Sequence, residues 1–73
     1  MVGNDAGWTQ IARDQVKILG DPVATVLART AYDEVARGFG AEGLLVMRPE
    51  QVATALAEAR AHAAAGRPVL VNV

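Results

Sequence analysis

Two uninterrupted apolar runs constrain the fold of this sequence more than any other feature. Residues 43–47 read Gly-Leu-Leu-Val-Met and residues 68–73 read Pro-Val-Leu-Val-Asn-Val, without the alternation expected of a strand with one solvent-facing side. Strands that are apolar on both faces belong inside parallel sheets. The sequence therefore predicts two buried parallel strands, which need a crossover connection between them.

The segment between the two runs has the pattern of that crossover. Pro49 suits the first position of a helix and Gly66 suits its end, which predicts a helix over residues 49–65. Its apolar stripe comprises Val52, Leu56, Ala59 and Ala63, and its solvent-facing side comprises Glu50, Glu58, Arg60 and His62. Strand, helix and strand form one βαβ unit, which we expect to be right-handed.

Two more helices are predicted upstream of this unit. Residues 8–19 carry an apolar stripe and are followed by Gly20, and residues 31–39 carry another and are followed by Gly40. The first stripe comprises Ile11, Ala12, Gln15, Ile18 and Leu19, and the second comprises Tyr32, Val35, Ala36 and Phe39.

The connector between these helices is less regular. Thr30 is expected to cap the second helix through its side chain. Residues 23–29, Val-Ala-Thr-Val-Leu-Ala-Arg, suit either a short extended piece or a buried connector. The sequence leaves both alternatives open.

The size of the chain limits what it can stabilise alone. A domain of 73 residues buries only about 60% of its unfolded surface. There is no Cys for a disulfide, and the single His62 has no partners for a structural zinc site. Met1-Val2 is too short for a full strand, and Val73 ends the chain inside a predicted one. We expect residues 1–73 to be a piece of a larger α/β domain, whose other parts cover the open sheet edges.

Charge and hydropathy exclude several kinds of partner. The 7 basic and 8 acidic residues are interspersed, which gives a net charge of -1 and no basic run for nucleic acid. No apolar stretch approaches the roughly 20 residues of a membrane span, and no secretory signal is present. We expect a cytoplasmic location, with no contact to membrane or nucleic acid.

One loop has the composition of a binding site. Gly3-Asn4-Asp5-Ala6-Gly7 is expected where a strand ends and a helix begins, the edge at which parallel α/β sheets bind ligands. Amide and backbone carbonyl oxygens suit Mg²⁺, and a helix N-terminus favours a phosphate. The same five residues also suit an ordinary turn.

A resemblance covers nearly the whole chain. Residues 3–16, residues 32–43 and residues 48–73 are similar, in that order, to the thiamine-diphosphate-binding domain of acetolactate-synthase-like and 2-hydroxyacyl-CoA-lyase-like enzymes. The resemblance implies that residues 1–73 form the C-terminal portion of a parallel-sheet, three-layer α/β/α domain.

The resemblance also implies roles for residues in the loop. In this family a Gly-Asp-Gly sequence and a later Asn pair bind the Mg²⁺ that holds the cofactor diphosphate. Asn4 matches the first Asn of that pair, Asp5 replaces the second, and Ala6 would lend its backbone carbonyl. Gly3 and Trp8 complete the implied cofactor-binding set, with Asn4 and Ala6 as the metal ligands.

Several of these residues have a structural alternative. Asp5 suits a helix cap as well as it suits a metal contact. Trp8 is either a stacking surface for the cofactor or a partly buried support beneath the first helix, and Gln10 is implied to lie near the substrate. His62 is expected to be exposed, without a catalytic role.

The implied activity needs groups that these residues do not include. The family makes or breaks carbon–carbon bonds next to a carbonyl, on 2-oxo acids or 2-hydroxyacyl-CoA, with thiamine diphosphate and Mg²⁺. It uses the Asp of Gly-Asp-Gly and a Glu from another domain, so no catalytic residue is assigned here. The implied partners are the remainder of a parent enzyme chain, or a second subunit, and a small-molecule substrate. The alternative is a non-catalytic α/β fragment or interaction module.

Overall fold

A parallel pair of strands organises the chain. The computed structural model describes residues 1–73, and its elements are α1 (Thr9–Leu19), α2 (Tyr32–Gly38), β1 (Glu42–Leu45), the 3-10 turn η1 (Pro49–Gln51), α3 (Val52–Ala64) and β2 (Val69–Asn72). β1 and β2 pair in parallel, with Glu42 opposite Val69 and Leu45 opposite Asn72. The two predicted strands and the crossover helix between them are confirmed, although β1 begins one residue early and ends two residues before Met47.

The N-terminus adds one further contact to the sheet. Val2 forms a parallel bridge with Asn72, in which Val2 N donates to Val71 O at 2.7 Å and Val73 N donates to Val2 O at 2.9 Å. Residues 1–2 form no full strand, as expected, yet they cover the open edge of β2. β2 therefore lies between β1 and the N-terminal segment.

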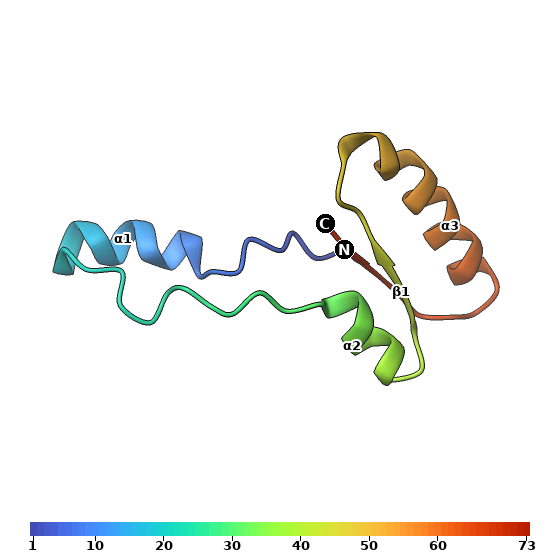
Figure 1. Ribbon diagram of the computed structural model, residues 1–73, viewed down its shortest axis with the longest axis horizontal. Helices are drawn as coiled ribbons and strands as arrows, with labels where there is room; N and C mark the ends of the chain where they lie inside the picture. Colours follow the sequence, from blue (N-terminus) through green and yellow to red (C-terminus); the bar gives the residue numbers. More distant parts are fainter.

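Helices cover both faces of this small sheet. Figure 1 shows α2 and α3 on opposite sides of the strands. The α3 side holds a core of Val46, Ala55 and Val71, with Leu44, Ala59 and Val69 packed against it. Alternate strand positions face α2, where a Cβ on Gly43 would lie 2.1 Å from the carbonyl oxygen of Asp33. Glycine at position 43 therefore lets α2 approach β1 backbone to backbone.

The buried face of α3 differs from the predicted one. The helical region spans residues 49–64 as expected, but its first turn is 3-10, and Gln51 Oε1 accepts the backbone N–H of Arg48 at 3.1 Å. Ala55 is buried and Ala59 packs on the core, whereas Val52 and Leu56 are 36% and 43% exposed. The small alanines allow close packing on the sheet, so the larger side chains lie at the margin of the contact.

The predicted cap of α2 is wrong. Ala31 occupies the N-cap position without a side-chain hydrogen bond, and the Thr30 hydroxyl instead donates to Ala28 O at 3.4 Å. Residues 23–29 contain no helix or regular strand, and Val26 forms an isolated antiparallel bridge with Gly7, outside the sheet. The extended alternative for this connector is therefore correct in part.

α1 and the connector form an arm that leaves the rest of the chain. Figure 1 shows α1 at the far end of this arm, and no other helix or strand packs against it. It begins one residue later than predicted and ends at Leu19 as predicted, and Gly20 follows with a φ of 71°. The radius of gyration is 15.5 Å, whereas a compact chain of this length has about 11 Å. Ile18 and Leu19 are 79% and 68% exposed, so the apolar stripe of α1 is uncovered.

None of the helices is both long enough and apolar enough to cross a membrane.

Candidate functional site

The predicted loop lies where the sequence places it. Residues 3–7 follow the strand-like contact of Val2 and precede α1. The backbone N–H of Asn4 donates to Val73 O at 2.9 Å, which joins the start of the loop to the carboxyl end of β2. This is the edge of the sheet at which open parallel α/β proteins bind their ligands.

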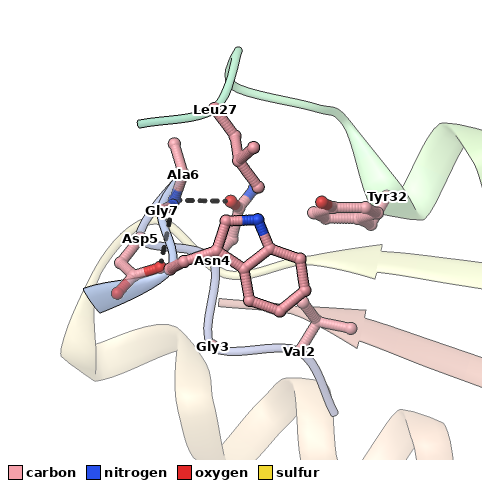
Figure 2. Close-up of a pocket in the computed structure, with 9 residues that line it drawn as sticks. Val2, Gly3, Asn4, Asp5, Ala6, Gly7, Leu27 and Tyr32 are labelled. Atoms are coloured by element: carbon pink, nitrogen blue, oxygen red, sulfur yellow. Dashed lines mark hydrogen bonds between the residues drawn. The ribbon is translucent and has the colours of Figure 1, made fainter. Parts of the chain in front are cut away.

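The side chain of Asn4 is held in one orientation. Its Nδ2 donates to the carbonyl oxygen of Thr30 at 2.9 Å, just before α2. Its Oδ1 accepts the backbone N–H of Ala6 at 3.3 Å, a contact that Figure 2 marks with a dashed line. Because the amino group of the amide is engaged, the oxygen faces the loop interior, where it retains a second lone pair.

Both carboxylate oxygens of Asp5 are used within the loop. Oδ1 accepts the backbone N–H of Gly7 at 3.2 Å, and Oδ2 accepts the hydroxyl of Thr9. The pKa of the Asp5 carboxyl is lower than its ordinary value, mainly because the Thr9 hydroxyl donates a hydrogen bond to it. Desolvation opposes this effect, and the Gly7 N–H adds to it. The N-cap of α1 is Trp8 and has no side-chain hydrogen bond. Asp5 thus joins the loop to α1 through Thr9, and it is not the N-cap residue of α1.

The connector holds the other side of the loop. Leu27 N donates to Ala6 O at 2.8 Å, and Trp8 N donates to Thr25 O at 2.7 Å. Ala6 itself has a φ of 54°, the left-handed region that favours glycine. Its carbonyl oxygen has one lone pair left for a cation. The sequence did not predict this support, because the residues that provide it do so through backbone groups.

A hollow of about 220 Å³ opens beside the loop. Figure 2 shows it between the loop, the connector and the first residue of α2. The lining residues are Val2, Gly3, Asn4, Asp5, Ala6, Gly7, Trp8, Leu27 and Tyr32. The structure thus brings all five predicted cofactor-binding residues to one concave surface.

Four residues of this surface lie outside the predicted cofactor-binding set: Val2, Gly7, Leu27 and Tyr32. Leu27 lay in the unassigned connector, and Tyr32 was assigned to the buried stripe of α2. Gln10 lies on α1 outside the hollow. Trp8 is 57% exposed, so more than half of its surface is accessible, and both alternatives for its role stay open.

His62 is not the exposed residue that the sequence predicted. Its side chain is 24% exposed, and its Nε2 lies 3.6 Å from Glu58 Oε1. The face of α3 that contains Ala55 and Ala59 packs toward the sheet. His62 lies three residues after Ala59 on the same face of the helix, so it is partly covered.

The oxygen atoms of the loop are suitable for part of a magnesium site. The chain contains no cluster of three or more His, Cys, Asp or Glu side chains that could bind a metal. The candidate ligands are the Asn4 amide oxygen and the Ala6 carbonyl oxygen, the hard, neutral oxygens that Mg²⁺ accepts beside carboxylates and phosphates. Two such ligands fall short of octahedral coordination, so phosphate, water or a carboxylate from other residues must complete it.

Comparisons with known proteins show the family of this chain. The family model of the thiamine pyrophosphate enzyme C-terminal TPP-binding domain matches residues 1–73. Human 2-hydroxyacyl-CoA lyase 2 is 51% identical over 75 aligned residues, and the protein of the same name from Bos taurus is 49% identical. A third, from Caenorhabditis elegans, is 58% identical over 43 residues, 59% of this chain.

The alignments with the human and bovine proteins cover 100% of this chain and 12% of each relative. The similarity therefore extends over the loop, all three helices and both strands. The chain belongs to the family of the C-terminal TPP-binding domain of thiamine pyrophosphate enzymes.

Proposed function

We propose that these residues provide part of the Mg²⁺–diphosphate site in an enzyme that uses thiamine diphosphate to make or break carbon–carbon bonds next to a carbonyl. The fixed Asn4 amide at the carboxyl edge of the sheet is the observation that supports this most. The relatives' name supports 2-hydroxyacyl-CoA as the substrate class, with 2-oxo acids as the alternative. We further propose a three-layer α/β/α parent domain and a cytoplasmic location.

The residues of the loop have distinct roles in this proposal. Asn4 Oδ1 and Ala6 O bind Mg²⁺, and Gly3 lets the diphosphate approach the backbone. Trp8 forms one wall of the cofactor site. Asp5 keeps the loop in shape through Gly7 and Thr9. Bound thiamine diphosphate supplies the stabilised carbanion, while these residues bind and orient it.

The remaining parts of the site come from other protein in this proposal. A carboxylate is needed to complete the metal site, and a carboxyl group that can donate a proton to the cofactor is needed as well. The chain spans about 12% of the length of the human and bovine relatives. We propose that the rest of the parent enzyme or a second subunit supplies both groups.

The proposal is tested in the protein encoded by the whole reading frame that contains these residues, called here the full-length protein. Its upstream sequence should encode a Gly-Asp-Gly motif. Isothermal titration should show Mg²⁺-dependent binding of thiamine diphosphate, and Asn4→Ala should weaken Mg²⁺ binding by at least about tenfold. Asp14→Ala, on the exposed surface of α1, is the control and should bind as the unaltered protein does.

Two results would overturn the proposal. One is thiamine diphosphate binding by the full-length protein that does not depend on Mg²⁺. The other is Mg²⁺ affinity that is unchanged in Asn4→Ala. Turnover of a 2-hydroxyacyl thioester, compared with turnover of a 2-oxo acid, then decides between the two substrate classes.

A further inference from the structure

A polar pair lies inside the contact between α2 and the sheet. Asn72 Nδ2 donates to Asp33 Oδ1 at 3.0 Å, and each residue is only 4% exposed. The other amide atom of Asn72, Oδ1, is buried without a hydrogen-bond partner. A buried polar atom without a partner costs free energy that an apolar side chain at this strand position would not cost. The stability of the core therefore does not account for Asn at position 72.

The pair lies next to the candidate metal ligand along two routes. Asn72 is the last residue of β2, and the backbone N–H of Asn4 donates to the following residue, Val73, at 2.9 Å. Asp33 lies in the first turn of α2, three residues after Thr30, whose carbonyl oxygen holds the Asn4 amide at 2.9 Å. The backbone of Asn4 is thus hydrogen-bonded to the end of β2, and its side chain is hydrogen-bonded to the residues just before α2.

Three hydrogen bonds link the loop, β2 and the start of α2 to one another in a ring. The loop is bonded to β2 through Asn4 N, β2 to α2 through the Asn72 side chain, and α2 back to the loop through Thr30 O. The direction of Asn4 Oδ1 therefore depends on the separation of β2 and the start of α2. Asp33 and Asn72 form the one side-chain hydrogen bond between these two elements.

We propose that Asp33 and Asn72 are positioning residues that orient Asn4 as a magnesium ligand, an inference that rests on the proposed function. Neither side chain contacts the metal. They set the distance across which the Asn4 side chain reaches Thr30, so the amide oxygen is directed into the site before Mg²⁺ arrives. Preorganised ligands bind more tightly because less conformational freedom is lost on binding.

The charge state of the pair fits this role. The pKa of the Asp33 carboxyl is lower than its ordinary value, mainly because the Asn72 amide donates a hydrogen bond to it. Burial opposes this effect, and the positive charge of Arg37 adds to it. Arg37 Nη1 lies 3.6 Å from Asp33 Oδ2. Asp33 is therefore an anion at neutral pH, and its negative charge selects the amino group of Asn72 as its neighbour.

An exchange of the two residues tests the proposal in the full-length protein. Asn72→Asp faces Asp33 with a second carboxylate and should weaken Mg²⁺ binding about tenfold in the presence of saturating thiamine diphosphate, measured by isothermal titration. The double variant Asp33→Asn/Asn72→Asp restores one donor and one acceptor. Its Mg²⁺ affinity should return to within about threefold of the unaltered protein.

The control breaks an exposed ion pair at the opposite end of the strands. Arg67 Nη1 lies 3.0 Å from Glu42 Oε1, and Arg67→Glu replaces this attraction with repulsion. This variant should keep its Mg²⁺ affinity, since the amino ends of the strands do not contact the loop. The Tm of each protein without cofactor is recorded alongside, so that a loss of stability is distinguished from a loss of affinity.

Each outcome decides the question. Unaltered Mg²⁺ affinity in Asn72→Asp, or a double variant as weak as the single one, overturns the positioning role. Asn72→Ser, which removes the contact without adding charge, takes the place of Asn72→Asp if that variant does not fold, and it should show the same weakening. Failure of the unaltered protein to bind Mg²⁺ with the cofactor refutes the proposed function itself.

Discussion

At the scale of single residues, the loop combines fixed and strained positions. Asn4 is held at both ends by hydrogen bonds to groups outside the loop. Ala6, two residues later, adopts a φ of 54°, in which its Cβ crowds the following carbonyl. The site thus depends on a backbone conformation that its own sequence disfavours, which is common where a backbone group contacts a ligand.

Ala6→Gly should stabilise the protein. Removing the Cβ relieves about 1 to 2 kcal/mol of left-handed strain, and the greater freedom of glycine in the unfolded chain cancels part of this gain. We expect a net increase of about 0.5 to 1 kcal/mol in the free energy of unfolding, measured by urea denaturation. Ala57→Gly, on the exposed side of α3, should instead destabilise by about 1 kcal/mol, and the same sign for both would contradict the argument.

Thr9→Val should make the protein more sensitive to acid. The Thr9 hydroxyl is the main cause of the lowered pKa of Asp5. A carboxyl whose pKa is lower when folded than when unfolded adds stability above its unfolded pKa, and that stability is lost as the pH falls through the folded pKa. Without the hydroxyl, the pKa of Asp5 should rise, and the acid-unfolding midpoint should move to higher pH. Thr54→Val, exposed on α3, should leave that midpoint unchanged.

At the scale of elements, α2 lies unusually close to the backbone of β1. Gly43 lies opposite the backbone of Asp33, and Arg37 Nη2 donates to Gly43 O at 2.6 Å. This contact lets α2 lie against β1 backbone to backbone, beside the Asp33–Asn72 pair.

Gly43→Ala should be strongly destabilising. The new Cβ would lie 2.1 Å from the carbonyl oxygen of Asp33, and backbone atoms cannot rotate away, so we expect a loss of about 3 kcal/mol, the upper end for overpacking. Gly38→Ala, in the last turn of α2 with open space around it, should be neutral or slightly stabilising. Urea denaturation compares the two; equal effects would show that the close approach has no energetic importance.

At the scale of the whole molecule, the amount of uncovered apolar surface stands out. Only 8 of 73 residues are buried, and the arm formed by α1 and the connector has no partner element. Surfaces of this kind mark contacts with other protein.

The isolated chain should therefore self-associate. We expect light scattering to detect oligomers or aggregates at high concentration, because apolar side chains such as Ile18 and Leu19 are accessible. Replacing both by Ser should reduce the association. A monodisperse monomer of the unaltered chain at high concentration would contradict the expectation.

The isolated chain should also lack a thermal response to its cofactor. With two candidate oxygen ligands and no carboxylate cluster, Mg²⁺ with thiamine diphosphate should not raise its Tm. A clear Mg²⁺-dependent increase would show that the site in these residues is more complete than proposed. Ca²⁺ is a suitable comparison, since it tolerates less regular coordination.

The sequence by itself determined the local elements and the position of the loop. The spans of α1 and α3 and the two parallel strands could be predicted, because periodicity depends on neighbouring residues. The set of Gly3, Asn4, Asp5, Ala6 and Trp8 came from the resemblance to the enzyme family. The structure brings these residues to one concave surface, and their role in cofactor binding stays a prediction.

Only the tertiary structure decided which surfaces meet. It showed the buried Asp33–Asn72 pair, the partly buried His62, the uncapped start of α2 and the connector that supports the loop. These features join residues far apart in the chain, often through backbone groups that every residue possesses. Their presence depends on how helices and strands pack, which no local pattern of side chains specifies.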